Sequence, residues 1–179
     1  MKPKINPENF AKILFDISEK NNVANEVKNA LLNINNMVAR NGQFRVFIQS
    51  KKINGQTKTE ILNKILADSS HPLANEIVSY LAGSGAINDL RNITFSFESL
   101  FKKKRNILDV EGVVAHQIPD QQIQSLKASL DEILGKKTML SIKVDTSLIG
   151  GIRLRIENTF LDASIQNRLQ TLHNELLQI

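Results

Sequence analysis

Residues 150–157 read Gly-Gly-Ile-Arg-Leu-Arg-Ile-Glu, and this stretch marks a part of the chain with the period of a sheet. From Ile152 to Glu157 apolar and polar side chains alternate, which is the pattern of a strand with one buried face. Residues 140–145 show the same alternation. Residues 159–162 follow as the pairing partner of the strand at 152–157. The two glycines supply the backbone freedom that a turn or bulge needs.

Further elements complete the predicted second half of the chain. Residues 108–114 predict a strand with an irregularity at Gly112, and Pro119-Asp120 then opens a helix that ends at Gly135. A last helix spans about residues 164–178. Its apolar stripe at helical spacing is Ile165, Leu169, Leu172 and Leu176. The predicted order is β-α-β-β-α, a small α/β layer.

Apolar residues in the first half recur at the spacing of helices. Asn6-Pro7 predicts the start of a first helix that runs to Lys20, with the asparagine as its cap. A second helix follows at about residues 23–40, and Gly42 is expected to take the left-handed conformation that ends it.

Four shorter helices are predicted next. The third covers residues 44–48, and the capping box Thr57-Lys58-Thr59-Glu60 opens the fourth. Pro72 opens the fifth, which stops at residues 83–85, and residues 90–101 form the sixth. Six amphipathic helices joined by brief polar links are typical of a compact bundle, in which each stripe is buried against its neighbours.

The first and fifth helices each carry apolar residues outside their main stripe. The stripe expected in the core of the first helix is Phe10, Ile13, Leu14 and Ile17. Ala11 and Phe15 fall outside it. On the fifth helix, Ala74 and Val78 fall outside the stripe formed by Leu73, Ile77, Tyr80 and Leu81. Such residues either pack on another helix of the bundle or meet a partner chain, and the spacing leaves both alternatives open.

The two halves also differ in charge. Residues 1–105 hold 16 Lys and Arg against nine Asp and Glu, a net charge of +7, whereas residues 106–179 hold seven against nine, a net charge of −2. We therefore predict an α+β protein with an N-terminal all-α bundle of about six helices at 1–105 and a small C-terminal α/β domain at 106–179.

Lys102-Lys103-Lys104-Arg105 is interpreted as the cationic end of a helix. The alternative is a phosphate-binding patch, which would make the chain a basic helical RNA-binding protein.

No catalytic or metal-binding constellation is evident in the sequence. It has no Cys, and His71, His116 and His173 stand apart without a second ligand at metal spacing, so neither a metal nor a cofactor is expected. Asp162 and Ser164 match a hydrolase triad only in residue type, and helix capping explains them better. No stretch reaches the roughly 18 apolar residues of a membrane span, so membrane association is expected to be indirect.

The tail resembles a known family. Residues 147–169 read Ser-Leu-Ile-Gly-Gly-Ile-Arg-Leu-Arg-Ile-Glu-Asn-Thr-Phe-Leu-Asp-Ala-Ser-Ile-Gln-Asn-Arg-Leu. They resemble the C-terminal signature of the ATP synthase delta subunit, called the oligomycin-sensitivity-conferring protein in mitochondria. The matching signature positions are Gly150, Gly151, Arg155, Asp162, Ser164 and Arg168. Residues 10–15, Phe-Ala-Lys-Ile-Leu-Phe, resemble the family's opening helix, whereas Ala163 stands where the family usually has glycine.

This resemblance implies a non-catalytic stator subunit of an F-type ATP synthase. The N-terminal bundle would grip N-terminal helices of alpha subunits in a groove of the first and fifth helices, with Ala11, Phe15, Ala74 and Val78 as candidate contacts. The C-terminal domain would hold b-type subunits of the peripheral stalk, and a beta-subunit contact is a further expectation.

The implied role is mechanical. The joint would resist torque, so that the rotor turns relative to the head and proton transport is coupled to ATP synthesis. The implied location is peripheral, on the cytoplasmic face of a bacterial inner membrane or the matrix side of an organelle membrane.

Overall fold

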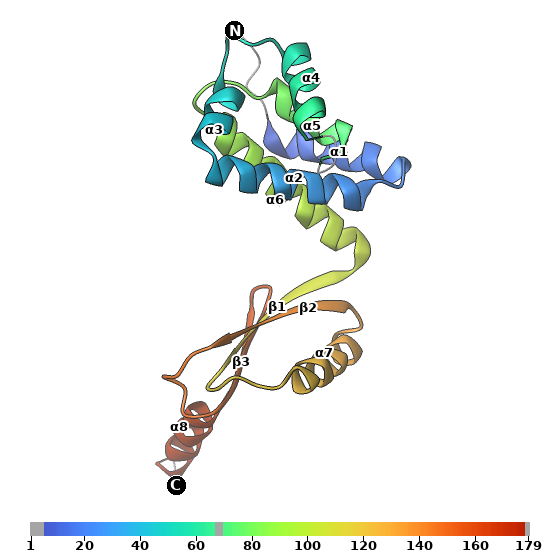
Figure 1. Cartoon of the computed structure of the whole chain (residues 1–179). Helices are drawn as coiled ribbons and strands as arrows, with labels where there is room; N and C mark the ends of the chain where they lie inside the picture. The colour runs from blue at the N-terminus through green and yellow to red at the C-terminus, as the bar shows by residue number, and fades with distance from the viewer. Residues whose placement is uncertain (1–5, 67–69, 178–179) are drawn as a thin grey trace. The chain divides into compact units, whose positions relative to one another are not determined.

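The computed structural model describes residues 6–66 and 70–177, and the chain divides into two compact units, Met1–Phe101 and Lys102–Ile179. The first unit is helical and the second contains a sheet (Figure 1), so the predicted α+β class is confirmed. The helices that precede the sheet are α1 (Pro7–Lys20), α2 (Ala24–Arg40), α3 (Gly42–Gln49), α4 (Gly55–Ile65), α5 (Pro72–Tyr80) and α6 (Ala86–Arg105), whose last turn lies in the second unit.

The face of α1 that enters the bundle is not the predicted one. Ile13 and Ile17, which were expected in the core, are 56% and 41% exposed. The buried residues of α1 are Ala11, Leu14, Phe15 and Ser18, so Leu14 is the one member of the predicted stripe that is fully in the core. Both sets follow the i, i+3, i+4, i+7 spacing, so the period fits either face and only packing distinguishes them.

Packing selects the second face for identifiable reasons. Ala11 is fully buried, and its small side chain allows neighbouring helices to come close. The ring of Phe15 meets the ring of Phe97 on α6 edge to face, with centroids 5.5 Å apart, which is a favourable aromatic arrangement. Ser18 is buried without a lost hydrogen bond because its hydroxyl donates to the Phe15 carbonyl at 2.9 Å.

Helix α1 begins as predicted, but two other helix ends differ from the prediction. Asn6 caps α1 by accepting from the Glu8 amide at 3.1 Å. Gly42 has no positive φ and begins α3, because the extended Asn41 ends α2 and caps α3. The cap of α4 is Asn54 rather than Thr57, since the Asn54 side chain accepts from the Thr57 amide at 2.8 Å.

Lys58 is a buried charge that joins three helices. Its side chain is 1% exposed, and Nζ donates to the carbonyl oxygens of Ile48 at 2.7 Å and Leu81 at 3.0 Å. These carbonyls lie at the C-terminal ends of α3 and α5, where a helix leaves acceptors unsatisfied and its dipole favours a cation. Lys58 therefore fastens α4 to the ends of two neighbouring helices.

The C-terminal unit is a four-stranded sheet with the order β2-β1-β3-β4. Strands β1 and β2 are parallel, which the crossover helix α7 permits, and β3 and β4 are antiparallel to their neighbours. The predicted order is one strand short, because residues 159–164 form a full edge strand. The elements are β1 (Ile107–Val114), α7 (Asp120–Leu134), β2 (Lys137–Val144), β3 (Gly151–Ile156), β4 (Thr159–Ser164) and α8 (Ile165–Leu176).

One face of this sheet forms the core of the unit. Val110 and Leu154 from the sheet pack with Leu130 from α7. Gly112 lies on the same buried face without the expected irregularity, since its pairing continues on both sides. A Cβ there would lie 2.6 Å from the Ile142 Cδ1 atom, so glycine makes room for a neighbouring side chain rather than for a bulge. Helix α8 contributes no buried residue.

Replacing Lys58 with Met tests the buried clamp. The Lys58→Met variant removes the donor from two buried carbonyls, and we expect it to lower the free energy of unfolding of the helical unit by about 3 kcal/mol. Urea unfolding followed by circular dichroism measures this change. Lys64→Met on the exposed side of α4 is the control and should change stability by less than about 0.5 kcal/mol. Equal stability of the two variants would contradict the clamp.

Candidate partner-binding surfaces

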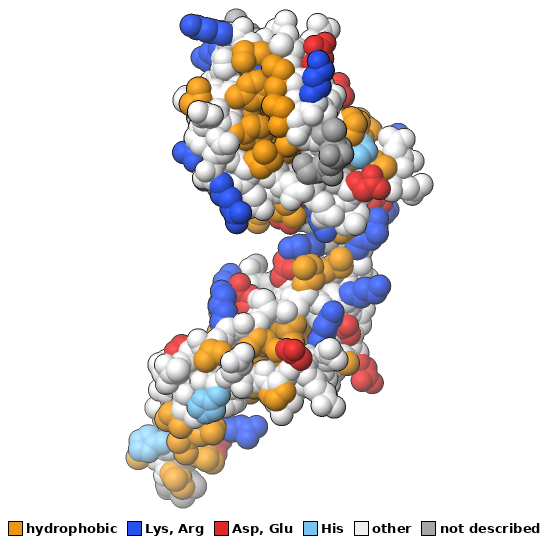
Figure 2. Space-filling view, in the orientation of Figure 1, with side chains coloured by type: hydrophobic (Ala, Val, Ile, Leu, Met, Phe, Trp, Pro, Cys, Tyr) orange, Lys and Arg blue, Asp and Glu red, His pale blue; other side chains and the backbone are white. Residues whose placement is uncertain are grey.

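Helices α1 and α5 pack side by side and leave apolar side chains uncovered along both. Ile13, Ile17 and Tyr80 are exposed, whereas Phe10, Leu73 and Ile77 are half-buried. We call these six residues the α1–α5 face. Figure 2 shows that hydrophobic side chains gather into a continuous patch on the visible side of the helical unit. Exposed apolar groups at helical spacing on two adjacent helices are typical of a surface that receives another helix.

The four partner-binding residues expected from the sequence lie elsewhere. Ala11, Ala74 and Val78 are fully buried, and Phe15 is 8% exposed. They fill the interior of the bundle and offer no side-chain surface to a partner in this arrangement. Of the two alternatives that the spacing left open, the structure therefore favours packing within the bundle. The exposed apolar residues of the same two helices, Ile13, Ile17 and Tyr80, belong to the stripes that were expected to be core.

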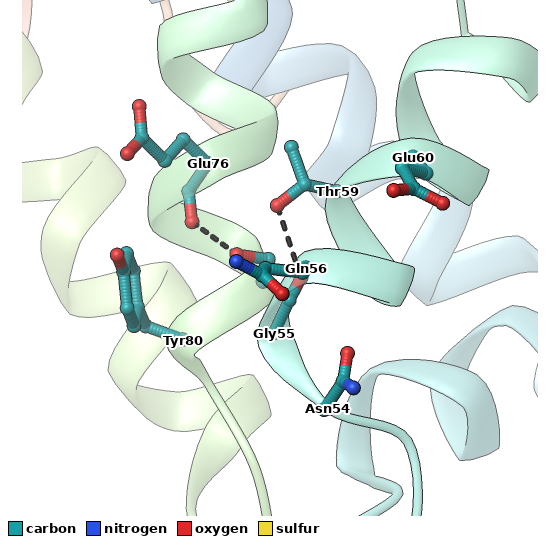
Figure 3. Close-up of a pocket in the computed structure, with 8 residues that line it drawn as sticks. Asn54, Gly55, Gln56, Thr59, Glu60, Glu76 and Tyr80 are labelled. Carbon is teal, nitrogen blue, oxygen red and sulfur yellow. Dashed lines mark hydrogen bonds between the residues drawn. The ribbon is translucent and has the colours of Figure 1, made fainter.

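A cleft of about 760 Å³ opens between α4 and α5 (Figure 3). Glu76 and Tyr80 extend from α5 on one side, and Gln56, Thr59 and Glu60 lie on α4 (Figure 3). The Ser79 hydroxyl donates to the Glu76 carbonyl at 2.6 Å. The sequence gave no sign of this cleft, because its two walls come from different helices.

In the second unit, Gly150 and Gly151 lie against the backbone where β4 ends and α8 begins. Gly151 has a φ of +85°, and a Cβ there would lie 2.5 Å from the Ala163 carbonyl oxygen and 2.8 Å from the Ser164 Cα. The Ile165 amide donates to the Gly150 carbonyl at 3.0 Å. Gly151 is therefore required both by its backbone conformation and by the close approach of the neighbouring strand.

Asp162 and Ser164 hold the start of α8. The Ser164 hydroxyl, fully buried, accepts from the Asn167 amide at 3.2 Å and caps the helix. An oxygen of Asp162 accepts from the Ser164 amide at 2.9 Å, and the other accepts from Arg153 Nε at 3.0 Å. Hydrogen bonding from Ser164, with the charge of Arg153 as a smaller cause, holds the pKa of Asp162 below its ordinary value of 3.8. These contacts are those of a helix cap, which is what the sequence favoured over a hydrolase triad.

The remaining signature positions behave differently from one another. The guanidinium of Arg155 lies over the Phe160 ring, 5.4 Å from its centroid, and Nε donates to the Glu157 carbonyl. Arg168 is exposed on α8. Ala163 pairs with Ile152 inside β4 and has no positive φ, so alanine is accepted there without strain.

Helix α8 presents its whole apolar stripe to solvent. Ile165, Leu169, Leu172 and Leu176 are between 45% and 72% exposed. Their spacing of four, three and four residues is that of a heptad seam, which suits packing against another helix. The sequence predicted the stripe, but not that no described residue of the unit covers it.

His71 and the basic run at 102–105 have structural roles. His71 Nδ1 accepts from the Leu73 amide at 3.2 Å and caps α5. The run at 102–105 forms the last turn of α6, as predicted, and Lys102 pairs with Asp109 at 2.7 Å. Among residues 6–66 and 70–177, no cluster of three or more His, Asp or Glu side chains could hold a metal ion. None of the helices in these ranges has the length and apolar character needed to cross a membrane.

Fold and surfaces together define a two-unit adaptor, with an uncovered apolar helical surface on each unit. The family model for the ATP synthase delta (OSCP) subunit matches residues 8–176. The chain belongs to this family.

Similar proteins agree with this assignment. The ATP synthase subunit delta of Caulobacter vibrioides is 27% identical over 166 residues, covering 92% of this chain and 90% of that protein. The sodium-ion-specific ATP synthase subunit delta of Propionigenium modestum is 25% identical, covering 91% and 93%. A chain of the mitochondrial ATP synthase hexamer of Toxoplasma gondii has a similar fold, with a TM-score of 0.60, 21% identity and coverage of 97% and 98%. The RNA-binding alternative has no support from these comparisons.

Substitution of Gly151 tests the constraint at the glycine pair. We expect Gly151→Ala to destabilise the C-terminal unit by about 3 kcal/mol, because positive φ and a backbone clash both oppose a Cβ. Gly135→Ala is the matched control, since Gly135 also has a positive φ of 61° but no atom within 4 Å of the added Cβ. It should cost only about 1 kcal/mol. Equal losses in thermal unfolding would show that the close approach to β4 is not what requires glycine.

Proposed function

We propose that this chain joins the catalytic head of an F-type ATP synthase to its peripheral stalk, through one uncovered apolar surface on each unit. Membership of the delta (OSCP) family makes the chain a structural subunit of the membrane-bound ATP synthase complex. The observation that carries the proposal is that each unit leaves a helical apolar surface exposed, the α1–α5 face in the first and the α8 stripe in the second. A protein that holds two bodies together needs such a surface for each.

The α1–α5 face is proposed to bind the N-terminal helix of an alpha subunit. Phe10, Ile13 and Ile17 form a ridge along α1 about 10 Å long, from a rise of 1.5 Å per residue. Leu73, Ile77 and Tyr80 run along the adjacent helix. A partner helix lying on both rows would bury side chains at its own i, i+3 or i+4, and i+7 positions.

The α8 stripe is proposed to bind the end of a b-type stalk subunit. Its four apolar residues span about 16 Å of helix, and their heptad spacing permits knobs-into-holes packing with a helical partner. The Ser164 cap and the Arg153–Asp162 pair hold the start of the helix to the sheet, so a force applied to α8 passes into the β3–β4 edge.

Under this proposal the chain acts mechanically and catalyses no reaction. It would hold the head against the torque of the rotor, so that ion transport is coupled to ATP synthesis. Its association with the membrane would run through the other subunits, on the side of the membrane where the catalytic head lies.

Binding at the α1–α5 face can be tested with a synthetic peptide of the alpha-subunit N-terminus from the same organism. We expect Ile13→Asp to weaken peptide binding to the full chain about 30-fold, because a charge replaces a central apolar anchor. Isothermal titration calorimetry measures the Kd, and circular dichroism checks that the exposed substitution leaves the fold intact. Phe95→Asp on α6 is the control, since Phe95 is also an exposed aromatic side chain. Equal peptide affinity of the two variants would disprove binding at this face.

Stalk binding can be tested in the same full-length chain. We expect the double substitution Leu169→Asp and Leu172→Asp to abolish binding of the soluble segment of the b-type subunit while leaving affinity for the alpha peptide within a factor of about two. Ile133→Asp, at an exposed position of α7, is the control. Retained stalk binding in a size-exclusion assay of the double variant would place the stalk contact elsewhere.

A further inference from the structure

The loop at residues 145–150, which joins β2 to β3, presents an exposed isoleucine beside the start of α8. Ile149 is 67% exposed, whereas Leu148 next to it is 2% exposed. The carbonyl oxygen of Gly150 accepts from the Ile165 amide at 3.0 Å, so the chain holds residue 149 next to the first residue of the α8 stripe. A Cβ at Gly150 would lie only 2.7 Å from the Ile165 Cδ1 atom, which shows how closely the loop and the helix pack.

Hydrogen bonds fix the shape of this β2–β3 loop. The Asp145 amide donates to the Val114 carbonyl oxygen at 2.9 Å, and the Leu148 amide donates to the Asp145 carbonyl oxygen at 3.1 Å. A carboxylate oxygen of Asp145 also accepts from the Ser147 amide at 2.9 Å. Because Leu148 is buried and these bonds are in place, Ile149 is held at the surface before any partner arrives. Little conformational entropy is therefore lost when a partner covers it.

The α8 stripe is too small to form a stable interface by itself. The helix has 12 residues, and only its apolar side, with Ile165, Leu169, Leu172 and Leu176, suits a helical partner. A stable interface between two proteins takes about 20 residues and about 800 Å² of surface from each partner. A subunit that binds α8 stably must therefore also contact residues outside this helix.

Ile149 extends the apolar surface of α8 onto the loop. A single apolar residue at a protein surface is ordinary and needs no explanation. Ile149 differs because the loop backbone bonds to Ile165, so the exposed isoleucine and the α8 stripe are neighbours. A partner that lies along the stripe and continues past the first turn of α8 meets Ile149 next.

The neighbouring β3–β4 hairpin is less suited to extend the interface. Arg153 is already paired with Asp162 at 3.0 Å. The guanidinium of Arg155 already lies over the Phe160 ring, 5.4 Å from its centroid. A partner that used these side chains would first have to break contacts within the unit, whereas covering Ile149 only displaces water from an apolar side chain.

We infer that the stalk subunit bound along α8 also covers Ile149, so that its binding site runs from Leu176 to Ile165 and then onto the β2–β3 loop. The inference rests on the proposed function, and it identifies a contact outside the helix and the end of α8 past which the partner continues. The partner is a helix that presents an apolar side chain beyond the residues that pack on α8. Ile149 anchors this end of the partner, and the hydrogen-bonded loop fixes the position of the partner along α8.

The test measures binding of the soluble segment of the b-type subunit to the full chain by isothermal titration calorimetry. We expect Ile149→Asp to weaken binding about tenfold, because a carboxylate would be buried against an apolar side chain of the partner. Ile149→Leu keeps the apolar character and should bind within a factor of about two of the unmodified chain. Ile133→Asp is the matched control, since it makes the same substitution at an isoleucine of α7 that is 79% exposed, and it should leave the Kd unchanged.

Two further measurements show whether Ile149→Asp acts at the interface. Circular dichroism during heating should give the melting temperature of the unmodified chain, because Ile149 is exposed. A photo-crosslinking side chain in place of Ile149 should form a covalent adduct with the b-type segment, and the same group in place of Ile133 should not. The crosslink decides the question if the aspartate variant proves less stable.

The outcomes separate this inference from the proposed function. If Ile149→Asp binds as tightly as the unmodified chain while the double variant Leu169→Asp and Leu172→Asp does not bind, the loop lies outside the interface and the stalk site on α8 stands. Equal losses for Ile149→Leu and Ile149→Asp, or no crosslink from position 149, also overturn the inference. If the double variant still binds the segment, the proposed stalk site is wrong and the inference falls with it.

Discussion

The burial of one particular face of α1 determines where the helical unit can meet a partner. Ala11, Leu14 and Phe15 enter the bundle, Phe15 packs against Phe97, and Ile13 and Ile17 are thereby turned to solvent. The opposite choice would bury the two isoleucines and leave a small side chain and one ring outside, with no continuous apolar row next to α5. When one face of α1 is buried, the opposite face is exposed, so the packing of α1 also decides which apolar side chains of this helix reach the surface.

A buried lysine links the helices that lie beside the α1–α5 face. Lys58 ties α4 to the C-terminal ends of α3 and α5, and α5 provides one row of the α1–α5 face. Such a cross-link opposes separation of the three helices, because pulling any of them away would leave a buried charge or buried carbonyl oxygens without a partner. In the C-terminal unit, the glycine pair, the Arg153–Asp162 pair and the Ser164 cap serve the equivalent purpose at the start of α8.

The two exposed apolar surfaces differ in construction. The α1–α5 face is made of apolar side chains, and Tyr80 at its end also lines the cleft between α4 and α5. The α8 stripe is a plain heptad seam with no sheet or helix of the described unit covering it. Membership of the ATP synthase delta (OSCP) family agrees with this arrangement, because a subunit of a larger complex has surfaces that other subunits cover.

The sequence by itself determined the class of the protein, the existence of the six helices of the first half, three of the four strands and the family signature, because these depend on local period and on residue types at fixed spacing. It also indicated that Asp162 and Ser164 form a cap rather than a catalytic site. Only the tertiary structure decided which face of α1 and α5 is buried, that Asn54 caps α4, that Gly112 makes room for Ile142, and that Glu60 and Glu76 share a cleft. Each of these depends on contacts between segments far apart in the chain, and a helical period that fits two faces equally well cannot show which of them the rest of the protein covers.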